Sequence, residues 1–304
     1  MGLEHIGFSI QSDPEREEEN RRQAEELLKE PAVRSLIESH RISEQSVISH
    51  PWKVRQWLVS YQPCIGCKGL SFCKQKPQGI YDSLSDDGFL HTVKCACRYE
   101  RTREKKLAHL DHYLINDLPQ SMDTVSFDQI SMENENEEYL EVVKTAMQAC
   151  YEEKGLYLCG NMGTGKTYLS ACASNYLAKK GKDIAFLHYP SFCQRMASQA
   201  KNGEFRTEFK RACYADFTVI DDIGAESVTE WNRDQILLPL LNERYERRLP
   251  TWFTSNEDLR SLEDHFRFSS RGKEETIKAA RITERISRMG KVATLTGKDR
   301  RKTL

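Results

Sequence analysis

The stretch GLYLCGNMGTGKTYLS, from Gly155 to Ser170, decides the fold of the second half of this 304-residue chain. It contains the pattern Gly-x4-Gly-Lys-Thr, which is typical of a loop that binds phosphates. Its glycines let backbone N–H groups point inward, because no Cβ atom stands in the way. An apolar run precedes the pattern and a helical pattern follows it, which is the context in which such a loop binds a nucleotide. We therefore expect a phosphate-binding loop (P-loop).

The side chains of this loop have expected roles. Lys166 can reach the β- and γ-phosphates of ATP, and Thr167 can bind Mg²⁺. A helix that begins near Lys166 adds its positive amino-terminal end. The residues expected to bind the nucleotide are Gly160, Asn161, Met162, Gly163, Thr164, Gly165, Lys166 and Thr167.

Apolar runs alternate with helical patterns after Tyr139. The runs GLYLCG, DIAFLHY, DFTVIDD and LPTWFTSN read as buried strands. Short apolar strands between helices predict an α/β fold with a parallel sheet. We expect an N-terminal domain at 1–105 with two helical stretches, 14–29 and 33–60, then a linker at 106–138 and an ATPase domain at 139–304.

Polar side chains end two of these strands. Asp221 and Asp222 end FTVIDD, at the strand edge where parallel sheets bind ligands. We expect Asp221 to hold the magnesium and Asp222 to polarise the attacking water. Asn256, at the end of LPTWFTSN, is the candidate for orienting that water. The alternative is that these residues only cap turns.

The end of the chain is basic. From Arg267 onward it has 12 Lys and Arg against 4 Asp and Glu. Arg281, Arg285 and Arg288 fall at helical spacings of four and three, so they share one helix face. This face is either a solvated basic surface or the source of an arginine finger for the ATP of a neighbouring subunit.

Composition excludes some classes of protein. The formal net charge is −1 and the mean hydropathy is −0.67. No apolar run approaches the ~18 residues of a membrane span, and the acidic start is unlike a signal peptide. We therefore expect a cytoplasmic protein without a membrane partner. Its ten cysteines are then expected to be reduced thiols or metal ligands.

Five cysteines lie close together in the first section. CIGCKGLSFC contributes Cys64, Cys67 and Cys73, and KCACRYE contributes Cys95 and Cys97. The Cys-x2-Cys step is usual in structural zinc sites, which take four ligands. Spacing does not decide whether Cys95 or Cys97 is a metal ligand. The alternative to a zinc site is a cluster of reduced cysteines without metal. The other cysteines lie on apolar segments and are expected in the core: Cys150, Cys159, Cys172, Cys193 and Cys213.

The second half resembles the bacterial replicative helicase loaders of the DnaI/DnaC type, which are AAA+ ATPases. The resemblance rests on KGLYLCGNMGTGKT, DDIGAES, LPTWFTSN, RGKEETIKAARITERI and GKDRR, in family order across residues 154–304. It implies that Arg285 is the arginine finger. It also implies a nucleotide-sensing arginine that acts in cis at Arg301, with Arg300 as the second choice.

The same resemblance implies a zinc-bearing N-terminal domain that docks on the helicase. It favours Cys97 as a ligand beside Cys64 and Cys67. For the remaining ligand Cys73 leads, with Cys95 and His91 as alternatives.

The implied function is to place a replicative hexameric DNA helicase on single-stranded DNA during initiation or restart of replication. ATP, Mg²⁺ and Zn²⁺ are the expected cofactors. The expected partners are the helicase, single-stranded DNA, other copies of the chain and other primosome proteins. Rival hypotheses are an IstB-type transposition ATPase, a small-molecule P-loop kinase, and a nucleotide-gated DNA-binding switch with little turnover.

Overall fold

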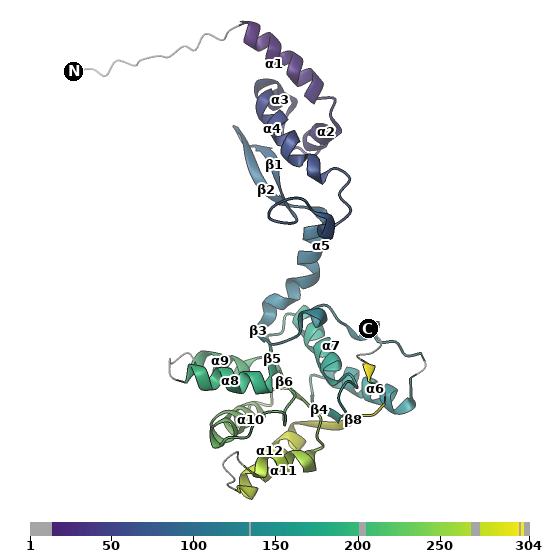
Figure 1. Ribbon diagram of the computed structural model, residues 1–304, viewed down its shortest axis with the longest axis vertical. Coiled ribbons are helices and arrows are strands. Elements are labelled where there is room, and N and C mark those ends of the chain that lie inside the picture. The colour runs from purple at the N-terminus through teal and green to yellow at the C-terminus, as the bar shows by residue number, and fades with distance from the viewer. Residues whose placement is uncertain (1–13, 134, 201–204, 269–273, 298, 301–304) are drawn as a thin grey trace, which may run out of the picture. The chain divides into compact units, whose positions relative to one another are not determined.

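The computed structural model describes residues 14–133, 135–200, 205–268, 274–297 and 299–300 (Figure 1). The chain divides into two compact units, Met1–Lys105 and Lys106–Leu304. No helix in these ranges is long and apolar enough to cross a membrane.

The first unit begins with four helices: α1 (Pro14–Leu27), α2 (Pro31–Glu38), α3 (Glu44–Ser49) and α4 (Pro51–Tyr61). The single helical stretch predicted over 33–60 is therefore wrong. His40 has a φ of +55°, which ends the helical backbone. Ser43 caps the next helix by accepting from the Ser46 N–H, and Pro51 starts a third one at a position where its missing N–H costs nothing.

A hairpin and one more helix complete this unit. Strand β1 (Ile80–Asp86) pairs antiparallel with β2 (Leu90–Ala96), and α5 (Arg98–Leu107) follows. Trp57 is buried between α4 and the hairpin, where its Nε1–H donates to the Asp82 carbonyl at 2.8 Å. The helices and the hairpin thus share one small core, which includes Val33, Val54 and Leu84.

The second unit is built on a six-stranded parallel sheet, as the alternation of strands and helices predicts. Its strands are ordered β3-β5-β6-β7-β4-β8. Their bounds are β3 (Tyr113–Asn116), β4 (Gly155–Gly160), β5 (Ile184–His188), β6 (Phe217–Asp221), β7 (Thr251–Ser255) and β8 (Gly290–Leu295). The helices are α6 (Glu137–Tyr151), α7 (Lys166–Lys179), α8 (Tyr189–Gln199), α9 (Phe205–Tyr214), α10 (Leu238–Glu246), α11 (Leu259–Arg267) and α12 (Thr276–Met289).

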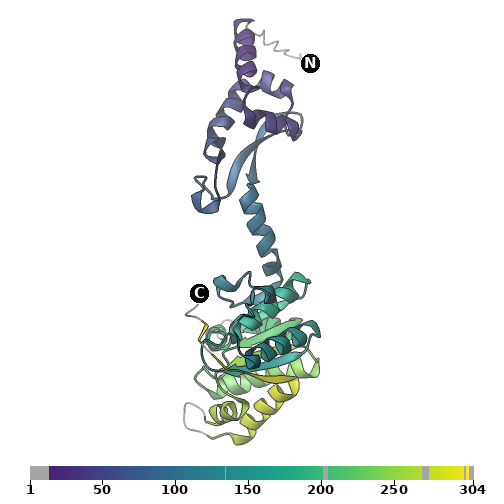
Figure 2. The ribbon, with the colours of Figure 1, turned by 90° about the vertical axis from the view of Figure 1, so that its right-hand side faces the viewer.

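Helices cover both faces of this sheet (Figures 1 and 2). Leu156 and Leu158 of β4 pack in the core formed with α6 and α7. Tyr157 and Cys159 lie in the core formed with α8 to α12. Successive side chains of a strand point to opposite faces, so a continuous apolar run such as β4 serves two cores at once.

The segment 106–138, expected to be a linker, contributes to the second unit. Its strand β3 pairs with β5 at the edge of the sheet. His109 is buried there, and its Nε2 lies 2.8 Å from the Asp123 carbonyl and 3.2 Å from Asn175 Oδ1 of α7. Tyr113 also donates to Asn175 Oδ1, at 2.7 Å. These contacts depend on tertiary packing, and the polar composition of the segment does not reveal them.

Candidate nucleotide site

The P-loop connects the end of β4 to the start of α7. Gly160, Gly163 and Gly165 have φ values of +140°, +79° and +103°, a region that only glycine adopts at low cost. A Cβ atom at Gly160 would also lie 2.1 Å from the Leu295 carbonyl oxygen. Gly165 caps α7, so the first N–H groups of that helix are available to an anion.

Lys166 is held inside the loop. Its Nζ donates to the carbonyls of Gly160 and Asn161 at 2.8 and 2.9 Å. It also donates to Asn256 Oδ1 at 2.9 Å. The lysine that we expect to contact phosphate is therefore joined to the residue that we expect to orient water.

Asp221 faces the P-loop from the end of β6. Thr167 Oγ1 donates to Asp221 Oδ1 at 3.0 Å, and Thr254 Oγ1 donates to the same oxygen at 2.6 Å. Burial raises the pKa of Asp221, while the two threonine hydroxyls oppose that rise. The two residues expected to hold magnesium, Thr167 directly and Asp221 through its water shell, are thus in direct contact.

Asp222 lies at the turn that follows. Its φ of +59° is uncommon outside glycine, and its N–H donates to Thr254 Oγ1 at 2.9 Å. Asn256 Nδ2 donates to Asp222 Oδ1 at 3.3 Å. The structure therefore brings Lys166, Thr167, Asp221, Asp222 and Asn256 together at the carboxyl edge of β4, β6 and β7.

Arg285 lies elsewhere. It is one helical turn from the end of α12, and α12 leads directly into Gly290, which pairs with Gly155 at the amino end of β4. Its guanidinium lies over the Tyr245 ring, 4.4 Å from the centroid. Arg281 and Arg288 line the same hollow as Arg285. Arg285 and Arg288 are thus near the edge of the sheet opposite the P-loop of their own chain.

Arg301 falls outside the described residues, and Arg300 lies against the P-loop. The Arg300 N–H donates to the Gly163 carbonyl at 2.9 Å. Its guanidinium pairs with both oxygens of Glu135, each at 2.6 Å, and covers the Tyr139 ring at 3.5 Å. Arg300, the second choice for sensing nucleotide, therefore lies beside the P-loop.

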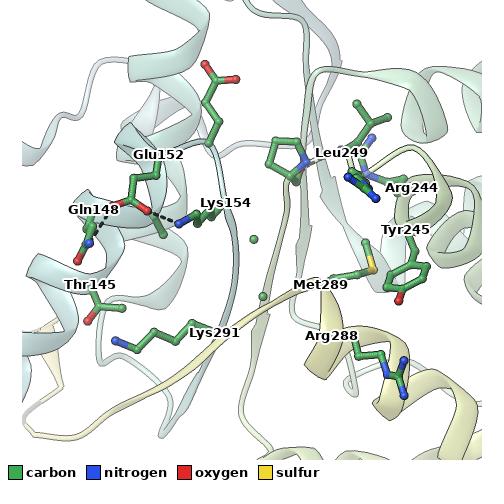
Figure 3. A pocket seen from close by; sticks show the side chains of 16 residues that line it. Thr145, Gln148, Glu152, Lys154, Arg244, Tyr245, Leu249, Arg288, Met289 and Lys291 are labelled. Atoms are coloured by element: carbon green, nitrogen blue, oxygen red, sulfur yellow. Dashed lines mark hydrogen bonds and ion pairs between the residues drawn. The ribbon is translucent and has the colours of Figure 1, made fainter.

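A separate hollow of about 550 Å³ opens at the amino edge of the sheet (Figure 3). Its rim carries Lys154, Arg288 and Lys291, and Lys154 pairs with Glu152. Arg244 also lines the hollow, and its guanidinium donates to buried carbonyls such as that of Ala215. The hollow holds none of the residues expected to bind or hydrolyse ATP.

In the first unit, the cysteines divide into two environments. Burial is the main cause that raises the pKa of the Cys64 thiol. The nearby sulfur atoms of Cys67, Cys73 and Cys97 raise it further by electrostatic repulsion. Cys95 differs, because its sulfur accepts from Arg41 at 3.2 Å. Within the described ranges, no three His, Cys, Asp or Glu side chains are arranged to hold a metal ion. The five cysteines expected in the core are buried: Cys150, Cys159, Cys172, Cys193 and Cys213.

Two residues of the site were not predicted from the sequence. Thr254 bonds Asp221 from the neighbouring strand, and Glu226 accepts from the Gly224 N–H at 2.9 Å. The signal for Glu226 was present, because DDIGAES places one more acid four residues after Asp222. No local pattern marked Thr254, since its role depends on the pairing of β6 with β7.

Comparisons with known proteins agree with this geometry. The family described as IstB-like ATP binding protein matches residues 87–301. The chain therefore belongs to the family of IstB-like ATP binding proteins, and it is an ATP-binding protein of the ATPase type.

Individual proteins that are similar to this chain have more specific names than the family. The replicative helicase loader DnaI of Bacillus subtilis (strain 168) is 27% identical over 311 residues, which cover 98% of this chain and 99% of that protein. A crystal structure of DnaI matches with a TM-score of 0.53 and 28% identity, over 63% of this chain and 98% of that one. A primosome component from Streptococcus pyogenes serotype M3 matches with a TM-score of 0.51 and 29% identity, over 64% and 97%.

The predicted resemblance to a helicase loader of the DnaI type is thereby confirmed. The parallel sheet flanked by helices is the AAA+ P-loop fold of that group.

Proposed function

We propose that this chain is an ATP-dependent loader that delivers a replicative DNA helicase onto single-stranded DNA. The observation that carries the proposal is the contact network of Lys166, Asn256 and Asp222 beside the Thr167–Asp221 pair. Together these residues provide a phosphate contact, a magnesium site and a group that can polarise water. Such a site suits a nucleotide switch on an assembly protein.

The extent of the similarity favours a loader over a transposition ATPase. The family match begins at residue 87, whereas the similarity to DnaI of Bacillus subtilis spans 98% of the chain and so includes most of the first unit. We infer that the first unit docks on the helicase and that the second binds ATP and DNA.

A loading assay tests this proposal. Purified replicative helicase from the same organism is mixed with closed circular single-stranded DNA, ATP and this protein, and helicase that remains on DNA after gel filtration is measured. We expect loading with the wild-type protein, and little with Lys166→Ala or without ATP. Equal loading in the absence of the protein would contradict the proposal.

We also propose that Arg285 completes the ATP site of a second copy. It lies at the edge of the sheet opposite its own P-loop, so it cannot contact the γ-phosphate bound in its own chain. A finger supplied in trans stabilises the charge that develops on the transferred phosphate. Self-association through the second unit follows from this assignment.

We further propose a zinc site formed by Cys64, Cys67, Cys73 and Cys97. Donors already face three of these sulfur atoms: Gln75 Nε2 to Cys64 at 3.3 Å, the Gly79 N–H to Cys73 at 3.3 Å and the Glu100 N–H to Cys97 at 3.5 Å. Such donors stabilise thiolate charge around a metal. Among the described residues these sulfur atoms do not form a group arranged to hold a metal, so zinc binding would draw them together and tie the Cys64–Cys73 loop to the end of the hairpin.

Metal analysis of the full chain tests the zinc site. We expect one zinc per chain in protein purified without chelators, and its loss in Cys97→Ser. Cys95→Ser is the matched control, because Cys95 bonds Arg41 instead, and it should keep the metal. Absence of zinc from the wild-type protein would contradict the assignment.

A second candidate is a nucleotide-gated DNA-binding switch with little turnover. Asp222 favours it, because its backbone is in the left-handed region and its side chain is one methylene shorter than glutamate. Measuring steady-state phosphate release, with and without single-stranded DNA, distinguishes the ATPase from the switch. Turnover that DNA or self-association stimulates supports the ATPase, whereas ATP-dependent DNA binding without phosphate release supports the switch.

A further inference from the structure

Glu226 is a buried carboxylate to which the proposed function gives no role. Its side chain is 6% exposed. Its Oε2 accepts a hydrogen bond of 2.9 Å from the Gly224 N–H. Within the part of the chain that the structure describes, its Oε1 has no hydrogen-bond partner. A buried carboxylate oxygen without a donor is costly, so a proton on this group would remove a real penalty.

A second carboxyl group reaches the same glycine from the end of β7. A Cβ atom added at Gly224 would lie 3.3 Å from Glu257 Oε2 and 3.4 Å from Ser255 Oγ. This Glu257 oxygen is also buried, with no partner among the described residues. Glu226 and Glu257 therefore meet at Gly224, between the segment that carries Asp222 and the segment that carries Asn256.

We propose that Glu226 is a positioning residue of the ATP site: through the Gly224 N–H it holds the Asp222–Gly224 turn beside Asn256, and a proton on its carboxyl group keeps it from repelling Glu257. This inference rests on the ATP hydrolysis proposed above. The turn has two other ties, from the Ile223 N–H to the Thr254 carbonyl at 2.9 Å and from Ser255 Oγ to the Ile223 carbonyl at 2.6 Å. A left-handed Asp222 persists only where its surroundings fix it.

The charged surroundings make this arrangement depend on pH. Burial, together with the charges of Glu257 and Asp222, raises the pKa of Glu226 to about 7. Burial also raises the pKa of Glu257, although His265, 3.7 Å away, opposes that rise. The titratable groups around the two carboxyl groups come from four segments of the chain: Asp222, Asp258 with His265, Tyr189 with Cys193, and Tyr157.

The direction of the effect follows from these charges. Below neutral pH Glu226 keeps its proton and carries no charge beside Glu257. Above it both groups ionise and repel each other at Gly224, which loosens the turn that aims Asp222. We therefore expect ATP turnover to fall as pH rises through about 7.

Two substitutions at this position test the inference, with turnover and ATP affinity measured from about pH 6 to 8.5. Glu226→Gln keeps an acceptor for the Gly224 N–H and stays neutral at every pH, so its turnover should lose the decline at high pH. Glu226→Ala removes both contacts, and we expect turnover about tenfold lower at every pH with ATP affinity unchanged.

Glu246→Gln is the control, because it removes an exposed carboxylate on α10 and should keep the wild-type profile. The inference is overturned if Glu226→Gln declines with pH as the wild type does, or if Glu226→Ala keeps full turnover. If Glu226→Ala does not fold, the dependence of turnover on pH in Glu226→Gln still tests the inference. A wild-type protein without turnover at any pH would instead refute the proposed hydrolysis, and this inference with it.

Discussion

Lys166 shows how one residue can be critical for binding and nearly neutral for folding. Its ammonium group already has acceptors within the loop, the carbonyls of Gly160 and Asn161 and the side chain of Asn256. These acceptors lie at the rim of the site, where water can replace the lysine. The phosphates of ATP have no comparable substitute for its charge.

We therefore predict that Lys166→Ala weakens ATP binding while the fold survives. Loss of a hydrogen bond to a charged group costs about 1.5–3 kcal/mol, which corresponds to about a 10- to 150-fold rise in Kd. Titration with a fluorescent ATP analogue measures this change, and circular dichroism checks the fold. Lys179→Ala, an exposed lysine at the end of the same helix, is the control and should bind normally. Unchanged affinity in Lys166→Ala would refute the P-loop assignment.

At the scale of single residues, the sequence predicts the functional residues that a local spacing pattern marks. Gly-x4-Gly-Lys-Thr marked Lys166 and Thr167, and the end of an apolar run marked Asp221. Thr254 was not predicted, because its partner Asp221 lies on another strand. Glu226 was not predicted either, although its acidic side chain stands in the same DDIGAES stretch and its partner Gly224 is two residues away. The partners of Arg300 could not be predicted from local spacing, because Glu135 lies 165 positions away in the chain.

At the scale of elements, buried Arg244 joins three segments of the second unit. From α10 it donates to the carbonyls of Ala212, Cys213 and Ala215 at the end of α9, at 3.2, 3.2 and 2.9 Å. It also donates to the Pro250 carbonyl, just before β7, at 2.9 Å. The last carbonyls of a helix have no partner within it, so this side chain caps α9 from outside.

We predict that Arg244→Leu destabilises the protein strongly. Each buried carbonyl left without a donor costs about 1–3 kcal/mol, so the free energy of unfolding should fall by about 3 kcal/mol or more. Urea denaturation followed by circular dichroism measures it. Arg247→Leu, which removes an exposed pair with Glu243, is the control and should leave the stability nearly unchanged. A small effect at Arg244 would show that water replaces its contacts.

The elements that the sequence predicts are those with a one-sided or fully apolar pattern. The runs that became β5, β6 and β7 are buried throughout or nearly so, and the sequence marks them clearly. Strand β8 is GKVATL, an edge strand with only Leu295 fully buried, so its pattern is weak. Helices α2 to α4 read as one stretch because their apolar spacing continues across the breaks at His40 and Pro51.

At the scale of the whole molecule, the two units have separate cores and separate proposed tasks. The first has only 105 residues and a small apolar core, so a zinc ion would add substantially to its stability. The second holds ATP at one edge of its sheet and presents Arg285 at the other. Under the proposed roles of these residues, a second copy of the chain completes each ATP site.

We predict that Arg285→Ala abolishes hydrolysis and leaves ATP binding intact. Arginine fingers contribute about 10³–10⁵ in rate, so even a slow ATPase should show the loss. An arginine that acted in cis would instead weaken ATP binding, and one on a solvated face would change neither quantity.

Mixing two inactive variants tests the shared ATP site most directly. The Arg285→Ala chain still binds ATP, and the Lys166→Ala chain still supplies a finger. Where the two lie side by side, one composite site is complete, so phosphate release should return in the mixture although each variant alone has none. If the mixture stays inactive while Arg285→Ala still binds ATP and both variants still bind the helicase, Arg285 is not shared between copies.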